Sequence, residues 1–305
     1  MRKNLKVLVT GGSGFVGSNL KKIRPNWIYI SSNDYDLKNP QEVQFMYKDV
    51  KPDVVLHLAA KVGGIKENAE KQADFYYINT AINTNIVKYA VDYGVQKLVA
   101  ALSTCVFPDV LENYPFTESD IFKGPPSKTN FSYGYSKRGL YAHCMAVRQQ
   151  YGLNYSCFSP SNVYGPGDHF DNPESSHFIA ALISKIATAK DGDCLEFWGT
   201  GKPLRQQLYV KDLCDIISVF VEQYFNTDKP VIVAPNENLS IKDMIDIAIR
   251  ISGKDLSYKF NEKLDGQYRK DGSNEYLMNI VNYKFTSFED GIKNTYNAYQ
   301  KERKT

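Results

Sequence analysis

No apolar run in the sequence is long enough to cross a bilayer, and its first residues lead into a strand-like run without a signal-peptide pattern. We therefore expect a cytoplasmic protein with no membrane partner. The five cysteines include no C-x-x-C pair, which predicts reduced thiols and no metal site. The formal net charge is only +3 and the lysines are scattered, so no nucleic-acid partner is expected.

What is present is the composition of a globular protein, with 43% apolar and 23% charged residues. Strand-like runs alternate with helical patterns through the first half of the chain. This alternation predicts an α/β fold with a doubly wound parallel sheet. The runs are residues 6–10, 27–30, 54–60, 97–102 and 155–159.

The regular alternation stops after residue 166, which suggests a second unit. We expect residues 1–165, with roughly 206–235, to form a dinucleotide-binding domain. Residues 166–205 and 236–305 would form a smaller α/β lobe that binds the substrate.

The first strand runs directly into a glycine-rich turn, in which Gly11, Gly14 and Gly17 form a G-x-x-G-x-x-G pattern before a helix. Glycines permit a tight turn and let the backbone approach a pyrophosphate at the helix N-terminus. The pattern therefore predicts a dinucleotide cofactor across the carboxyl edge of the sheet. Its predicted contacts are Gly11, Ser13, Gly14, Phe15, Val16 and Gly17 in the turn, Leu58, Ala59 and Ala60 after the third strand, Lys137, and Pro160, Asn162 and Val163 after the fifth strand.

The end of the second strand bears on the choice between NAD and NADP. An acid at this point usually binds the adenosine ribose of NAD. This chain has Ser31, Ser32 and Asn33 there, and neutral side chains tolerate a 2′-phosphate, so we predict NADP. NAD is the less favoured alternative, in which Asp34 or Asp36 reaches back to the ribose.

A Tyr–Lys pair supplies candidate catalytic residues. Tyr133 and Lys137 are spaced so that both side chains share one face of a helix. The charge of Lys137 would lower the pKa of Tyr133, which would protonate a carbonyl oxygen as hydride reaches the carbon. Ser103 and Cys105, at the end of the fourth strand, should face the nicotinamide. Taken alone, such a Tyr–Lys pair more often marks an exposed helical face.

Several polar residues receive other interpretations. His57 lies within an apolar strand and is predicted to belong to the core, and Asp212 and Asp215 are predicted to be structural. A helix over 176–185 with Ser176 as its N-cap would place His177 in its first turn, facing the pocket.

The glycine motif, the serine that ends the fourth strand and Tyr133-x-x-x-Lys137 together resemble the extended short-chain dehydrogenase/reductase superfamily, whose fold is Rossmann-type. Within that superfamily the chain resembles the GDP-L-fucose synthase family. The resemblance covers nearly the whole chain. Its motifs here are 59–65 (A-A-K-V-G-G-I), 103–105 (S-T-C), 162–166 (N-V-Y-G-P), 176–177 (S-H) and 197–205 (F-W-G-T-G-K-P-L-R).

The resemblance implies a role for each matching residue. Ser103, Tyr133 and Lys137 would form the reductase triad, and Cys105 and His177 would be the base and acid that invert C3 and C5 of a sugar. The implied substrate contacts are Asn162, Lys185, Trp198, Arg205 and Lys270, with Lys185, Arg205 and Lys270 at the nucleotide diphosphate and its sugar and Trp198 at the guanosine. The family often has Arg near the second strand end, where this chain has serine. The resemblance also implies a homodimer, formed through helices over 73–93 and 133–151.

The activity implied is NADPH-dependent reduction of the C4 ketone of a GDP-linked 4-keto sugar, with or without C3/C5 epimerisation. The sugar would be GDP-4-keto-6-deoxy-mannose or a GDP-4-keto-heptose, and the setting would be surface-glycan biosynthesis, such as that of a capsular polysaccharide. A C4 reductase without epimerase activity, another nucleotide-sugar epimerase and an inactive cofactor-binding protein remain alternatives. A dehydratase is disfavoured because Thr104 and Cys105 stand where an acidic pair is expected.

Overall fold

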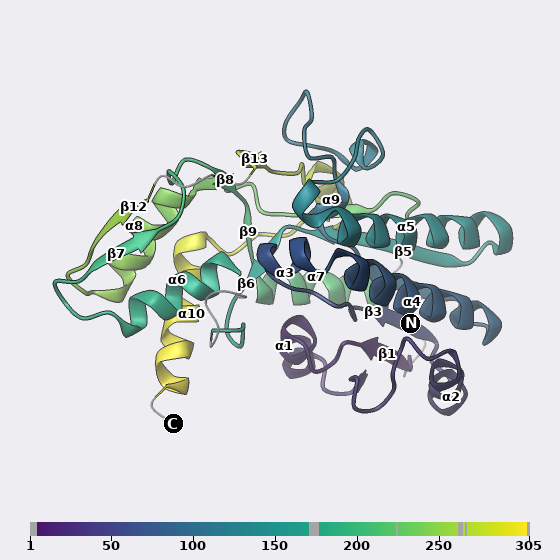
Figure 1. Cartoon of the computed structure of the whole chain (residues 1–305). Coiled ribbons are helices and arrows are strands. Elements are labelled where there is room, and N and C mark those ends of the chain that lie inside the picture. Colours follow the sequence, from purple (N-terminus) through teal and green to yellow (C-terminus); the bar gives the residue numbers. More distant parts are fainter. Residues whose placement is uncertain (1–4, 171–176, 224, 262–264, 266, 304–305) are drawn as a thin grey trace.

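The computed structural model describes residues 5–170, 177–223, 225–261, 265 and 267–303. Six parallel strands form the central sheet, in the order β10-β5-β4-β3-β1-β2. They are β1 (Val7–Thr10), β2 (Ile28–Ile30), β3 (Val54–His57), β4 (Lys97–Ala101), β5 (Asn154–Pro160) and β10 (Val231–Val233). The sheet and its flanking helices confirm the predicted doubly wound α/β fold (Figure 1).

Helices cover both faces of the sheet because its strands are apolar on both sides. Leu8 of β1 packs on the face covered by α2, α4 and α5, while Val7 and Val9 pack on the opposite face with α1, α7 and α9. The bounds of these helices are α1 (Phe15–Ile23), α2 (Pro40–Val50), α4 (Gln72–Asp92), α5 (Phe131–Tyr151), α7 (Val210–Glu222) and α9 (Glu275–Ile280). The short helices α3 (Ile65–Glu70), η1 (Thr104–Val106), η2 (Glu118–Asp120) and η3 (Lys128–Asn130) lie in the connections.

A smaller lobe lies beside the carboxyl edge of the sheet (Figure 1). Its apolar core joins three helices to a parallel strand pair, and a three-stranded sheet of order β11-β8-β13 runs between the lobe and the central sheet. The elements of the lobe and of this three-stranded sheet are α6 (Phe178–Thr188), α8 (Ile241–Ser252), α10 (Phe288–Glu302), β7 (Cys194–Phe197), β8 (Leu204–Arg205), β11 (Leu239–Ser240), β12 (Ser257–Phe260) and β13 (Arg269–Lys270). The pair β6 (Asn162–Tyr164) and β9 (Gln207–Tyr209) links the lobe to the sheet.

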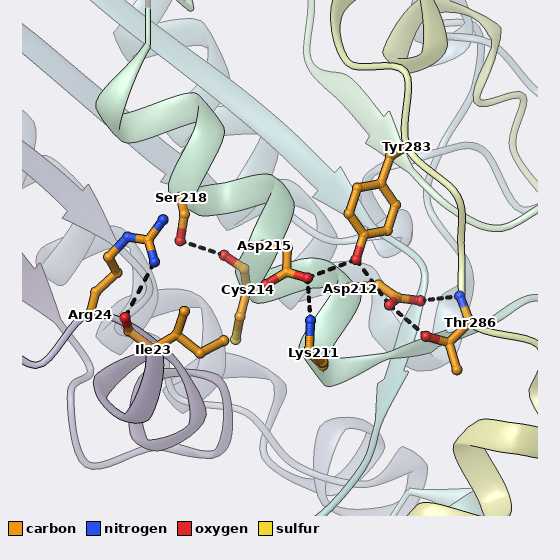
Figure 2. Close-up of polar contacts among 9 residues, drawn as sticks. All are labelled: Ile23, Arg24, Lys211, Asp212, Cys214, Asp215, Ser218, Tyr283 and Thr286. Atoms are coloured by element: carbon orange, nitrogen blue, oxygen red, sulfur yellow. Dashed lines mark hydrogen bonds and ion pairs between the residues drawn. The ribbon is translucent and has the colours of Figure 1, made fainter.

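An acidic pair on α7 ties down the segment between α9 and α10. Asp212 accepts hydrogen bonds from the Tyr283 hydroxyl at 3.1 Å and from the backbone and hydroxyl of Thr286 at 2.8 and 2.7 Å (Figure 2). Asp215 accepts from the same Tyr283 hydroxyl and pairs with Lys211. The structural role predicted for Asp212 and Asp215 is thereby confirmed.

Several element boundaries differ from the predictions. The third strand ends at His57 rather than continuing to residue 60, because its pairing with β1 and β4 stops at His57. The helix predicted over 176–185 begins at Phe178, with His177 as its N-cap residue, so the prediction of His177 in the first turn is wrong. Ser176 lies outside the described residues. No helix in the described ranges has the length and apolarity needed to cross a membrane.

Candidate active site

Ser103 and Cys105 lie in one tight turn where β4 ends. The Ser103 hydroxyl oxygen accepts a hydrogen bond from the backbone N–H of Cys105 at 3.2 Å and so caps η1. Both side chains are partly exposed, while Thr104 between them is buried. Because ligands bind beyond the carboxyl ends of parallel strands, this turn presents a hydroxyl and a thiol at the expected place.

Helix α5 brings Tyr133 and Lys137 to the same turn. Gly134 makes this approach possible, because a Cβ on it would lie 2.6 Å from the carbonyl oxygen of Cys105. The Lys137 ammonium donates to the carbonyl oxygen of Ala101, the last residue of β4, at 2.8 Å. It also lies 5.9 Å from the centroid of the Tyr133 ring. The structure therefore brings Ser103, Cys105, Tyr133 and Lys137 together.

Burial decides the proton affinities of the Tyr–Lys pair. Lys137 is 1% exposed, and burial lowers its pKa to about 8. Burial raises the pKa of Tyr133, and the nearby Cys105 raises it further. The predicted lowering of the pKa of Tyr133 is therefore wrong in direction, because burial disfavours the charged phenolate. A raised pKa keeps the phenol protonated, which suits a residue that donates a proton.

A buried polar chain beneath this site was not predicted. His57 is fully buried and burial lowers its pKa to about 3, so the imidazole is neutral. Its Nδ1 lies 2.8 Å from the Thr10 hydroxyl and its Nε2 lies 3.0 Å from Oδ1 of Asn83. The Asn83 amide in turn donates to the carbonyl oxygen of Ser136 at 3.2 Å. This chain joins β1, β3, α4 and α5, and it confirms His57 as a core residue.

The glycine turn has the shape of a cofactor cradle. Gly11 has φ +73°, and a Cβ on it would lie 2.9 Å from the backbone nitrogen of Ala59. A Cβ on Gly17 would collide with the carbonyl oxygen of Gly11. Helix α1 begins at Phe15 with no side-chain cap and no acid in its first turn. Its N-terminal N–H groups and dipole therefore suit a pyrophosphate.

Two further cofactor segments are fixed beside this turn. The run after β3 is held by Asn79, whose amide accepts from the backbone N–H of Lys61 at 2.9 Å and donates to its carbonyl oxygen at 3.0 Å. Asn79 lay on a predicted helix, but the sequence carried no sign of this contact. Leu58, Ala59 and Ala60 are in this run, and Pro160, Asn162 and Val163 follow or end β5 at the same edge of the sheet.

The second strand end holds an acid as well as the predicted neutral residues. The Asp34 carboxylate accepts hydrogen bonds from the backbone N–H and hydroxyl of Ser31, at 2.7 and 2.8 Å. These bonds lower the pKa of Asp34. Ser31 in turn accepts from the backbone of Asn33 at 3.2 Å, and Ser32 and Asn33 are exposed. Asp34 thus reaches back to the strand end, as the NAD alternative required.

One of the predicted substrate residues, Lys270, reaches the site, and Arg205 lies beside it on the neighbouring strand. Lys270 pairs with Arg205 in the register of β13 and β8, and the Lys270 ammonium lies 3.4 Å from Sγ of Cys105. The Arg205 guanidinium donates to the carbonyl oxygen of its neighbour Leu204 at 2.7 Å.

The other predicted substrate residues lie on α6 and around β7. The Lys185 ammonium donates to the carbonyl oxygen of Glu196 at 2.5 Å and lies 4.9 Å from the centroid of the Phe197 ring. Trp198, directly after β7, is 79% exposed. His177 is exposed at the start of α6. Burial raises the pKa of Asp168, and the nearby His177 opposes that rise.

The fold and this site define a class of protein. Residues 7–234 match the NAD dependent epimerase/dehydratase family, and the chain belongs to that family. The predicted enzyme class, an NAD(P)-dependent oxidoreductase or epimerase, is thereby confirmed. No described group of three or more His, Cys, Asp or Glu side chains is arranged to hold a metal ion.

Particular relatives narrow the comparison. The chain is 36% identical over 301 residues to the GDP-L-fucose synthase of Dictyostelium discoideum, which covers 94% of this chain and 92% of that protein. It superposes with a TM-score of 0.88 on a GDP-L-fucose synthetase from Naegleria fowleri bound to NADP, at 30% identity over 100% of this chain and 95% of that one. These similarities confirm the predicted resemblance to GDP-L-fucose synthases.

A GDP-6-OMe-4-keto-L-xylo-heptose reductase from C. jejuni superposes with a TM-score of 0.90, at 23% identity over 99% of both chains. At that identity the likeness establishes the fold alone.

Proposed function

We propose that this protein uses NADPH to reduce the C4 ketone of a GDP-linked 4-keto sugar. The observation that carries the proposal is the convergence of Ser103, Tyr133 and Lys137 where β4 ends, with α5 packed against the turn at Gly134. A hydroxyl, a phenol and an ammonium in one place can bind and protonate a carbonyl oxygen.

The residues of this site have separate tasks in reduction. Tyr133, kept protonated by its raised pKa, donates a proton to the carbonyl oxygen. Ser103 donates a hydrogen bond to the same oxygen, and the Lys137 ammonium supplies positive charge beneath it. NADPH, when bound, supplies the hydride. Residues of the glycine turn and the segments after β3 and β5 would hold the dinucleotide, because glycine leaves room there and the start of α1 is uncapped.

We further propose that the same site inverts C3 and C5 before reduction. The C4 ketone acidifies the neighbouring C–H bonds, and Cys105 lies directly beside the residues that would bind the ketone oxygen. Cys105 would remove a proton as the base, and His177 would return one to the opposite face of the sugar. The preferred substrate is GDP-4-keto-6-deoxy-mannose, because relatives at 30% identity or above that cover most of the chain are named GDP-L-fucose synthases.

The choice of NADP rests on two observations. Ser31, Ser32 and Asn33 offer neutral groups at the end of β2, and the Naegleria fowleri relative is a complex with NADP. Asp34 is the feature that favours NAD.

The remaining parts of the proposal concern partners and setting. We propose a cytoplasmic homodimer formed through α4 and α5, since the aromatic side chains Tyr76, Tyr77 and Tyr135 on these helices are exposed. The product would enter surface-glycan biosynthesis. The second candidate is a C4 reductase for a GDP-4-keto-heptose without epimerase activity.

The decisive experiment follows NADPH oxidation with GDP-4-keto-6-deoxy-mannose in deuterated water and examines the product by NMR. Oxidation with deuterium at C3 and C5 is the expected result. Oxidation without deuterium would identify a plain C4 reductase. NADPH binding without oxidation would exclude this sugar, and the GDP-4-keto-heptose would be assayed in its place. Tyr133→Phe is the control, since it should bind NADPH and fail to oxidise it.

A further inference from the structure

We propose that Lys270 is a positioning residue that holds Cys105 as an aimed thiolate for proton abstraction. This inference rests on the proposed epimerase function and assigns Lys270 a task other than contact with the diphosphate. It starts from the separation of 3.4 Å between the Lys270 ammonium and Sγ of Cys105, two residues that are 165 positions apart in the chain.

The charge of Lys270 is directed to the sulfur because the neighbouring acid is already paired. Asp271 is 4% exposed and holds the Arg269 guanidinium through both carboxylate oxygens, at 2.5 and 2.9 Å. Among the residues that the structure describes, none of the ion pairs includes Lys270. A lysine ammonium beside a thiol favours the thiolate, which is the nucleophilic and basic form of cysteine.

The segment that carries Lys270 is held from two sides. From the lobe, the Gln206 amide accepts from the backbone N–H of Gly272 at 2.9 Å and donates to its carbonyl oxygen at 3.1 Å. From the loop before η2, the backbone of Phe116 donates to Asp271 at 2.9 Å and accepts from Ser273 at 2.7 Å. Four backbone or amide contacts thus fix the backbone directly after Lys270, from which its side chain reaches Cys105.

The other groups around Cys105 leave this task to Lys270. The Ser103 hydroxyl oxygen is turned to the backbone N–H of Cys105, and Tyr133 is a neutral phenol with a raised pKa. Lys137 directs its ammonium to Ala101. Lys270 is therefore the cation in hydrogen-bond contact with the sulfur among the described residues.

The chemical step balances without a further reactant. The Cys105 thiolate forms an S–H bond with the hydrogen next to the ketone, and the C–H bond breaks. Its electron pair forms the C=C bond of an enolate, and the former C=O pair moves to the oxygen beside Ser103 and Tyr133. His177 then gives its proton to the opposite face of the carbon. Lys270 keeps its proton throughout and acts through charge and orientation alone.

The test compares alkylation of Cys105 in full-length Lys270→Met, Lys270→Arg and wild-type protein. Iodoacetamide at pH 7 is used without substrate, and peptides are quantified by mass spectrometry. Cys194 is exposed on β7 and serves as an internal reference in every sample, and Lys242→Met, which removes an exposed lysine paired with Asp246, is the matched control. Lys270→Met should slow alkylation of Cys105 relative to Cys194 by about tenfold, while Lys270→Arg should stay within about threefold of wild type.

A second measurement separates positioning from substrate binding. With the 4-keto sugar in deuterated water, Lys270→Met should lower kcat for deuterium uptake about tenfold more than it lowers kcat for reduction of an already inverted ketone. A rise in KM alone, with unchanged alkylation, would overturn the proposal in favour of a diphosphate contact. A different outcome is that the three proteins show the expected alkylation rates but the wild type takes up no deuterium. That outcome would overturn the epimerase function, and with it the role of Cys105 as the base.

Discussion

Gly134 approaches Cys105 so closely that a single added carbon would lie 2.6 Å from the carbonyl oxygen of Cys105. The same carbon would lie 2.8 Å from Cβ of Pro126, so the neighbourhood is closed on two sides. This contact sets how near the helix of Tyr133 and Lys137 comes to the turn of Ser103 and Cys105.

Gly134→Ala should therefore displace the start of α5 and lower both activity and stability. Overpacking of this kind typically costs about 1–3 kcal/mol, and we expect kcat to fall at least about tenfold. Gly139 lies on the same helix, and a Cβ there would have no neighbour within 4 Å, so Gly139→Ala is the matched control. Its free energy of unfolding should rise by about 0.4–1 kcal/mol. Equal effects of the two substitutions on kcat would contradict the role given to the contact.

Lys137 should reduce stability while it supports activity. Its folded-state pKa of about 8 lies below the ordinary value of ~10.4, so the unfolded chain binds more protons between these two values. The cost of burying the ammonium is therefore complete below pH 8 and is lost as the pH rises towards ~10.4. Lys137→Met should unfold at higher denaturant than wild type at pH 7, with a gap that narrows by pH 10. NADPH oxidation by this variant should fall at least about 100-fold.

The measurement for Lys137 is the free energy of unfolding in urea at both pH values, alongside the turnover rate. Lys97→Met provides a comparison, because burial also lowers the pKa of Lys97 to about 8 at the opposite edge of the sheet. That variant should retain turnover. A Lys137→Met protein that is less stable than wild type at pH 7 would refute the sign of the effect.

Cys105→Ser should separate the two proposed reactions. A serine hydroxyl keeps the size of the side chain but is a far weaker acid than a thiol, so it makes a poor base near neutral pH. Reduction of a ketone already inverted at C3 and C5 should stay within about threefold of wild type, while deuterium uptake at those carbons should vanish. NMR of the product in deuterated water reads both outcomes, and persistent uptake would remove Cys105 as the base.

Asp34→Asn should increase the preference for NADPH over NADH. The substitution removes a carboxylate that Ser31 holds at the strand end, where a 2′-phosphate would meet like charge. The ratio of kcat/KM values for the two cofactors should shift towards NADPH by about tenfold. Asp36→Asn is the control, because Asp36 pairs with Lys38 at 3.2 Å and should leave the ratio unchanged. An unaltered ratio in Asp34→Asn would mean that this carboxylate lies away from the ribose.

The features that the sequence predicted well are those with local spacing. The strand before Gly11 and the face shared by Tyr133 and Lys137 each depend on residues within one turn or one strand, so short patterns suffice. The doubly wound parallel sheet also follows from the regular alternation, and Ser103 lies just beyond the carboxyl end of β4.

The features that were missed depend on distant segments. Asn83 and Lys270 reach His57 and Cys105 through packing that joins separate elements, and no local pattern marks either contact. The pKa of Tyr133 was predicted in the wrong direction because desolvation is a property of the folded neighbourhood rather than of sequence spacing. His177 lies at a helix boundary, where assignments by pattern are least secure.

The two proposed reactions, reduction and inversion, depend on residues from different parts of the molecule. Ser103, Tyr133 and Lys137 all belong to the sheet and its covering helix, whereas Cys105 is met by a lysine from the lobe. Widening the space between lobe and sheet would separate the Lys270–Cys105 contact and leave the three reductase residues in register. In a lineage built on this scaffold, inversion could thus disappear while reduction survives, through changes far from any residue that touches the ketone.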